Sequence, residues 1–123
     1  MKIAALILTI LVIVEHIYFW ILEMFLWTIR GPKVFGFTPE YAESTKVLAA
    51  NQGLYNAFLA AGLIWALTIR DTIWKYNISL FFLICIVIAG IYGGLSSNIK
   101  IMYIQGVPAL LAMTLVILVK NRE

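Results

Sequence analysis

The stretch VIVEHIYFWILEMFLW, residues 12–27, is almost entirely apolar, yet it carries Glu15, His16 and Glu23. It belongs to a longer apolar segment, and about 20 helical residues are enough to cross the hydrocarbon core of a bilayer. On a helical wheel the three ionisable side chains fall within about 100° of one another. A charged residue at the centre of a membrane helix costs roughly 2.5–3.5 kcal/mol. We therefore expect this face to point toward other helices and away from lipid.

The composition indicates an integral membrane protein. The chain has 123 residues, of which 63% are hydrophobic and 12% are charged, whereas about a quarter of a soluble domain is charged. The formal net charge is +3, and the Lys and Arg residues lie at segment ends. This pattern is typical of membrane topology signals and excludes a nucleic-acid partner. Cys85 is the single cysteine, so no intrachain disulfide can form.

Four apolar stretches are long enough to span a membrane, and no alternating pattern typical of a β-barrel is present. The last two connections are short, which favours antiparallel neighbours. We predict an all-α fold, an integral membrane four-helix antiparallel bundle forming one transmembrane domain over residues 1–123. The expected helices are residues 3–29, 46–69, 74–95 and 99–119, with a long loop at residues 30–45.

The long loop contains its own helix-start signal. Thr38 suits a helix cap, Pro39 suits the first helical position, and Glu40 suits the first turn. Either the second helix begins early or a short interfacial helix precedes it. The side that carries both termini has five Lys and Arg residues against four on the loop side. This count predicts a multi-pass cell-membrane protein with both termini in the cytoplasm.

The second helix is predicted to carry two distinct stripes. Polar side chains gather on one side of it, and small residues follow a strict four-residue spacing on the other side. Such small residues allow helix backbones to approach closely. The polar set is Asn51, Gln52, Tyr55 and Asn56, and the small set is Ala49, Gly53, Ala57 and Ala61.

Depth along the helices predicts where the polar groups meet. On the loop side of the membrane midplane we place Glu23, Asn51, Gln52, Tyr55, Tyr92 and Gln105. Glu15, His16 and Asn56 then lie at the floor of this layer, and the other half of the bundle is apolar. We expect a polar pocket that opens toward the long loop, which would act as a lid. Pro108 predicts a helix kink beside the pocket. Trp27 and Trp74, near segment ends, are typical of the aromatic belt at a membrane surface.

The predicted ligand- or proton-binding residues are Glu15, His16, Glu23, Asn51, Gln52, Tyr55, Asn56, Tyr92 and Gln105. In this hypothesis the two glutamates hold a proton or a cationic or hydrogen-bonding small molecule, and the amides and tyrosines orient it. His16 and Glu23 are about 10 Å apart along one helix, which is too far to share a metal ion. We predict no metal site, no cofactor and no assigned catalytic residue.

Four stretches of the sequence stand out: EHIYFWILEMFLW (15–27), KVFGFTPE (33–40), KVLAANQGLYNAFLAAGLIW (46–65) and AGIYGG (89–94). Together they resemble the DUF1304 family of small four-helix membrane proteins. The resemblance covers nearly the whole chain. It implies the four-helix membrane architecture, and it implies no reaction, substrate or cofactor.

Three functional hypotheses remain open. The first is a membrane-embedded protein that binds or transports a small molecule or proton, with membrane lipid around it and a homodimer providing any translocation path. The second is an intramembrane enzyme acting on a lipid-like substrate, in which His16 and a glutamate move protons. The third is a structural or accessory protein with no ligand, in which the polar layer fixes helix register.

Overall fold

A computed structural model describes residues 1–123 and contains helices and no strands, which confirms the all-α prediction. The chain forms four long membrane-crossing segments, the last of which is interrupted by a π-helix. The elements are α1 (Ile3–Phe25), α2 (Trp27–Phe35), α3 (Pro39–Thr68), α4 (Thr72–Ser96), α5 (Ile99–Ile101), the π-helix η1 (Met102–Gly106) and α6 (Val107–Lys120).

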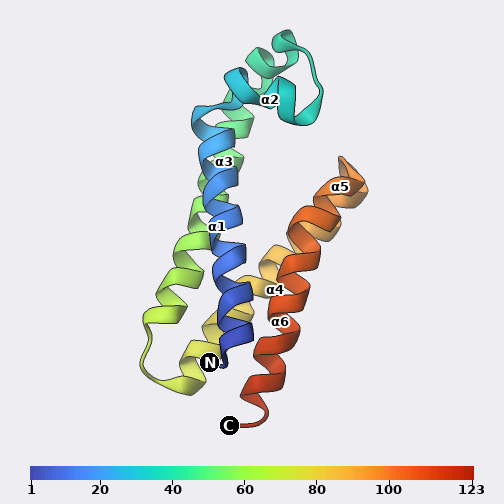
Figure 1. The fold of residues 1–123 in the computed structure, drawn as a ribbon. Helices are drawn as coiled ribbons and strands as arrows, with labels where there is room; N and C mark the ends of the chain where they lie inside the picture. Colours follow the sequence, from blue (N-terminus) through green and yellow to red (C-terminus); the bar gives the residue numbers. More distant parts are fainter.

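The long helices form two hairpins that pack into one bundle. One hairpin joins α1 to α3 through α2, and the other joins α4 to α6 through α5 and η1 (Figure 1). Helix α1 packs on α3 and α6, and α4 packs on the same two helices, so the four form a closed ring. Both termini lie at one end of the bundle, and α2 lies at the other end (Figure 1).

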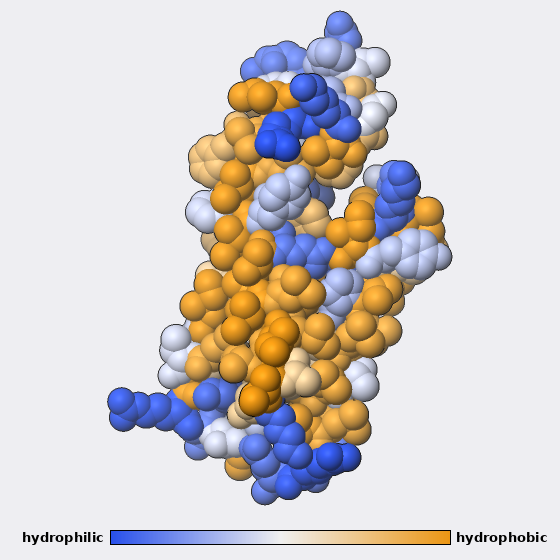
Figure 2. All heavy atoms as spheres, in the orientation of Figure 1, coloured by the Kyte–Doolittle hydropathy of each residue, from blue (hydrophilic) through white to orange (hydrophobic).

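The surface of the bundle suits a lipid environment. Four helical segments are long and apolar enough to cross a membrane: Ile3–Phe25, Pro39–Thr68, Thr72–Ser96 and Ile99–Lys120. Large apolar side chains along them are exposed, including Ile10, Phe58 and Ile88. Figure 2 shows a broad hydrophobic band between two hydrophilic ends. This arrangement is that of a multi-pass membrane protein.

The segment at residues 30–45, expected as a loop, is mostly helical, because α2 and the start of α3 occupy it. Both alternatives read from the sequence therefore occur together: a short helix precedes, and the second long helix begins early. The Thr38 hydroxyl caps α3 by accepting a hydrogen bond from the Tyr41 backbone N–H at 3.2 Å, and Pro39 takes the first helical position. Gly36 ends α2 with a φ of 74°, a left-handed conformation that glycine adopts without strain.

The contact face of α3 differs from the predicted small-residue stripe. The buried positions include Ala49, Gly53, Asn56, Ala60 and Leu63, with steps that alternate between four and three residues, while Ala61 is exposed. Gly62 is buried separately, against Phe82 of α4. A strict four-residue repeat drifts around an α-helix, whereas alternating steps of three and four stay on one face. Amide and small side chains therefore share one stripe that faces α1.

The interruption expected at Pro108 takes the form of the π-helix η1, which ends two residues before it. Proline has no backbone N–H, so it cannot make the regular hydrogen bond of an α-helix. Here α4 and η1 pack with their backbones in contact. A Cβ built on Gly90 would lie 2.8 Å from the Gly106 Cα, and one on Gly94 would lie 2.5 Å from the Met102 Cβ. Glycine is required at position 90 because a side chain there would collide with the Gly106 backbone, which cannot move aside as a flexible side chain can.

Two glycine substitutions on α4 should separate this backbone contact from ordinary packing. Gly90→Ala should lower the free energy of unfolding by about 1–3 kcal/mol, the usual cost of overpacking. Gly93→Ala should cost less, because its new methyl group would meet only the Ile101 Cγ2 at 2.9 Å, on a side chain that can shift. Reversible unfolding in detergent measures both. Equal losses for the two variants would show that the Gly90 contact is not special.

Candidate functional site

The polar groups and the apolar core occupy different halves of the bundle. Fully buried apolar residues such as Val12, Leu63, Leu83 and Val116 fill the half nearer the two termini. The hydrogen-bonded groups Glu23, Gln52, Asn56 and Gln105 lie toward the α2 end. The half nearer the termini also contains the fully buried hydroxyl residues Thr9 and Ser79, so the predicted difference in polarity holds for the carboxyl and amide groups only.

Glu23 is the centre of the polar half. Asn56 Nδ2 donates a hydrogen bond to Glu23 Oε2 at 2.8 Å, and Gln52 Nε2 donates to Glu23 Oε1 at 3.4 Å. The side chains of Glu23 and Asn56 belong to residues that are each only 8% exposed. These bonds join α1 to α3 by polar groups inside the span. Amide N–H groups match a carboxylate, which in its ionised form can only accept.

Gly53 makes this pairing possible by bringing the two backbones together. A Cβ built on Gly53 would lie 3.1 Å from the Glu23 Cβ, the Met24 backbone nitrogen and the Trp20 carbonyl oxygen. Gly53 also lies between the two amide donors in sequence, so one turn of α3 supplies both the close approach and the hydrogen bonds. A larger residue there would push the amides away from the carboxylate.

His16 belongs to a second polar contact, between α1 and η1. Its ring is fully buried, and Nδ1 lies 2.8 Å from the Val12 carbonyl oxygen. A carbonyl only accepts, so Nδ1 carries the hydrogen and Nε2 of the neutral ring is an acceptor. The Gln105 side-chain amide donates to that nitrogen at 3.4 Å. The π-helix thus places Gln105 beside His16.

Glu15 stands apart from both contacts. It is partly buried, and its Oε2 is a buried atom without a hydrogen-bond partner. About 12 Å of helix axis separate it from Glu23. The structure therefore places the two glutamates at different depths and in different surroundings.

Three of the predicted site residues lie away from Glu23. Tyr55 is 62% exposed and Tyr92 is 72% exposed. Asn51 is also exposed and donates to the Val47 carbonyl of its own helix at 3.0 Å. On α4 the inward positions are Gly90 and Gly94, which leaves Tyr92 on the outer side. The structure does not bring these three side chains to the polar cluster.

A pocket of about 390 Å³ reaches Glu23 from the α2 end. Figure 2 shows the molecule hollowed between this end and the α5 turn, with hydrophilic residues inside the hollow. The pocket lies between the two hairpins. Its lining residues are Glu23, Trp27, Phe35, Phe37, Tyr41, Thr45, Leu48, Ala49, Gln52, Ser97, Asn98 and Ile101.

Aromatic side chains form one wall of this pocket, and the sequence analysis missed them as a group. Ring centroids lie 4.9 Å apart for Trp27 and Phe37, 5.8 Å for Phe35 and Phe37, and 5.1 Å for Phe37 and Tyr41. A Cβ on Gly31 would come within 3.0 Å of the Phe37 ring, so this glycine leaves space for it. In the sequence, Trp27, Phe35 and Phe37 lie close together with Gly31 and Gly36 between them, a pattern that could have indicated a cluster of rings. Trp27 by itself indicated only the aromatic belt at a membrane surface.

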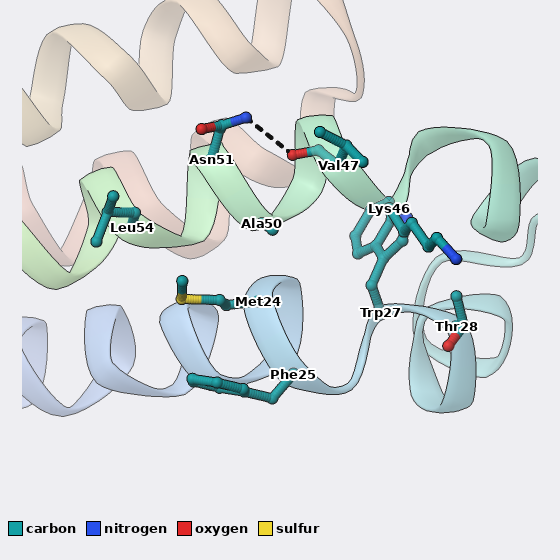
Figure 3. A pocket seen from close by; sticks show the side chains of 9 residues that line it. All are labelled: Met24, Phe25, Trp27, Thr28, Lys46, Val47, Ala50, Asn51 and Leu54. Atoms are coloured by element: carbon teal, nitrogen blue, oxygen red, sulfur yellow. Dashed lines mark hydrogen bonds between the residues drawn. The ribbon is translucent and has the colours of Figure 1, made fainter.

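A second hollow, of about 520 Å³, lies on the outside between α1 and α3. Met24 and Phe25 line it from α1, Leu54 lines it from α3, and Lys46 lies near Trp27 at one end (Figure 3). It contains no buried ionisable group. Lys46 is exposed and forms an ion pair with Glu43. We therefore place the candidate site at Glu23 and not in this groove.

The arrangement of ionisable side chains shows no metal centre. No three His, Cys, Asp or Glu residues come close enough together to hold a metal ion. The chemistry available at the Glu23 pocket is therefore that of one carboxyl group, amide donors and aromatic rings.

The fold and this pocket define a four-span, multi-pass membrane protein with a carboxyl group buried inside the bundle. The family model described as "Protein of unknown function (DUF1304)" matches residues 10–117, and the chain belongs to this family. A relative from Lactococcus lactis subsp. lactis (strain IL1403), "Uncharacterized protein YpaA", is 36% identical over 116 residues, which cover 92% of this chain and 96% of that protein. No solved structure matches the chain.

The α1–α3 contact predicts a measurable coupling between Glu23 and Asn56. In a double-mutant cycle of Glu23→Leu and Asn56→Leu, the free energy of unfolding should show a coupling of about 0.5–2 kcal/mol, the range for hydrogen bonds inside membranes. The matched cycle of Glu23→Leu and Gln52→Leu should show a smaller value, because its bond is longer and Gln52 is exposed. Additive effects for Glu23 and Asn56 would contradict the assignment.

Proposed function

We propose that this protein binds a small molecule inside the membrane, in the Glu23 pocket, as a binding or transport protein. One observation carries the proposal: the carboxyl group that joins α1 to α3 also lines an open pocket of about 390 Å³. Ionisable groups inside a membrane span are costly and by default indicate a functional site. The pocket volume lies within the usual range for small-molecule sites.

The hydrogen bonds at Glu23 leave it able to bind a ligand. An ionised carboxylate has about four acceptor sites, and the amides of Asn56 and Gln52 use two of them. The amides hold the carboxyl group in one orientation, and the pocket gives a ligand access to it. Such preorganised polar groups in an apolar pocket provide specificity in small-molecule sites.

The packed apolar core bears on whether the protein transports its ligand. In this conformation the core closes the half of the bundle nearer the termini, so a ligand reaches Glu23 only from the α2 end. Transport would require a second conformation in which that half opens, or a second copy of the chain that supplies the rest of a path. Binding is the part of the proposal that this conformation supports directly.

A structural or accessory role is the second candidate, because both Glu23 oxygens already have donors within the chain. In that case the carboxyl group would serve only to fix the α1–α3 register. The enzyme hypothesis gains no such support, because His16 does not line the pocket. A ligand-binding measurement separates the first two candidates.

Binding can be tested with three matched compounds: benzyl alcohol, benzoate and benzyltrimethylammonium. In the variant Trp20→Phe/Trp65→Phe/Trp74→Phe, Trp27 is the only tryptophan and reports on the pocket by its fluorescence. We expect at least one compound to give a saturable change. Ser97→Trp, which narrows the pocket, should weaken that binding about tenfold or more when followed by isothermal titration calorimetry in the wild-type background.

The control is Ser96→Trp, one residue away and outside the pocket lining, which should bind as the wild type does. Circular dichroism and size-exclusion chromatography show whether each variant is folded. If neither these three compounds nor the choline tested below binds to the folded wild-type protein, the binding proposal fails and the structural role takes its place.

We further propose that both termini face the cytoplasm, as the count of Lys and Arg residues favours. The two termini share one end of the bundle (Figure 1), so a single experiment orients all four spans. Green fluorescent protein fused after Glu123 should fluoresce, and alkaline phosphatase fused there should be inactive. A fusion after residue 98 should give the reverse result. The opposite pattern at both sites would place the termini outside.

A further inference from the structure

We propose that the Glu23 pocket takes an organic ammonium cation, a positively charged nitrogen with apolar substituents. This inference rests on the proposed function and names the chemical class of its ligand. It follows from the charge of the pocket, its aromatic wall and the state of its other polar groups.

The charge of the lining favours a cation. Glu23 is the only carboxyl group among the lining residues, and no Lys, Arg or His lines the pocket. In the water-poor interior of the bundle a carboxylate attracts a positive charge more strongly than in bulk solvent. An anionic ligand would meet the carboxylate without a compensating positive side chain.

The aromatic wall suits a cation with apolar substituents. The rings of Trp27, Phe35, Phe37 and Tyr41 lie in successive contact, with neighbouring centroids 4.9–5.8 Å apart. The faces of aromatic rings attract cations, and aromatic cages are a known way to recognise quaternary ammonium groups. Aromatic side chains and one carboxyl group line the same pocket, and these are the two kinds of group that such a site combines. The apolar substituents would pack against Leu48 and Ile101, which also line the pocket.

Several of the other polar side chains in the lining are already hydrogen-bonded within the chain. Thr45 Oγ1 donates to the Tyr41 carbonyl at 2.7 Å and accepts from Trp27 Nε1 at 3.0 Å. Asn98 Oδ1 accepts from the Lys100 backbone N–H at 3.0 Å, and the Gln52 amide donates to Glu23. The Tyr41 and Ser97 hydroxyl groups also line the pocket and offer only neutral hydrogen bonds, so Glu23 is the lining group that distinguishes a cation from a neutral ligand.

The test compares choline with 3,3-dimethylbutan-1-ol, which has the same shape but a carbon atom in place of the charged nitrogen. Isothermal titration calorimetry on the wild-type protein in detergent should show choline binding about tenfold more tightly, the ratio expected for a desolvated cation on aromatic rings. Glu23→Gln should remove this preference. Phe37→Leu and Tyr41→Leu should reduce it several-fold, whereas Tyr41→Phe should keep it.

Phe81→Leu is the matched control, because Phe81 is 62% exposed on α4 and is absent from the pocket lining; its preference should equal that of the wild type. Equal affinity for the two compounds, or a preference that persists in Glu23→Gln, would overturn the inference. If benzyl alcohol or benzoate binds in the pocket while choline does not, the inference of a cationic ligand is wrong and the binding proposal stands. If no compound binds, both fail.

Discussion

A carboxyl group inside a membrane must find its hydrogen bonds within the protein, and the contact between α1 and α3 supplies them to Glu23. Gly53 brings the two backbones close enough for Asn56 and Gln52 to reach the carboxyl oxygens. The rest of the α2 end depends on this contact. It fixes the depth of Glu23, and α2, which follows α1 directly, contributes Trp27 and Phe35 to the pocket lining.

The second hairpin is positioned by a different device. Glycines on α4 let the π-helix approach, and the π-helix carries Gln105 to the buried ring of His16. Helix α3 and the π-helix η1 thus each contact α1 through polar side chains, at two different depths. The two hairpins diverge toward the α2 end. The pocket lies between them there and is lined by residues of both. The proposed site and the helix packing therefore share the same few residues.

Local signals predicted much of this arrangement from sequence. The four spans, the Thr38 cap, the inward face of Glu23 and its approach to Asn56 and Gln52 follow from hydropathy, capping preferences and helical periodicity. The outward positions of Tyr55 and Tyr92 could not be predicted in the same way, because a helical wheel does not say which neighbour covers which face. The aromatic wall was missed because it depends on the left-handed turn at Gly36, which folds Phe37 back onto α2.

The π-helix also determines how many residues the last span can contain. A π-turn holds one more residue than an α-turn. The residues of the last span before η1 are therefore rotated about the helix axis by about 100° relative to those of α6. Removal of a single residue within Met102–Gly106 would let the segment close into a continuous α-helix. Its first two turns would then rotate, and residues that now face lipid would turn inward. Insertions or deletions in this segment are therefore tolerated only as whole helical turns. Substitutions of side chains on its outer face are not limited in this way.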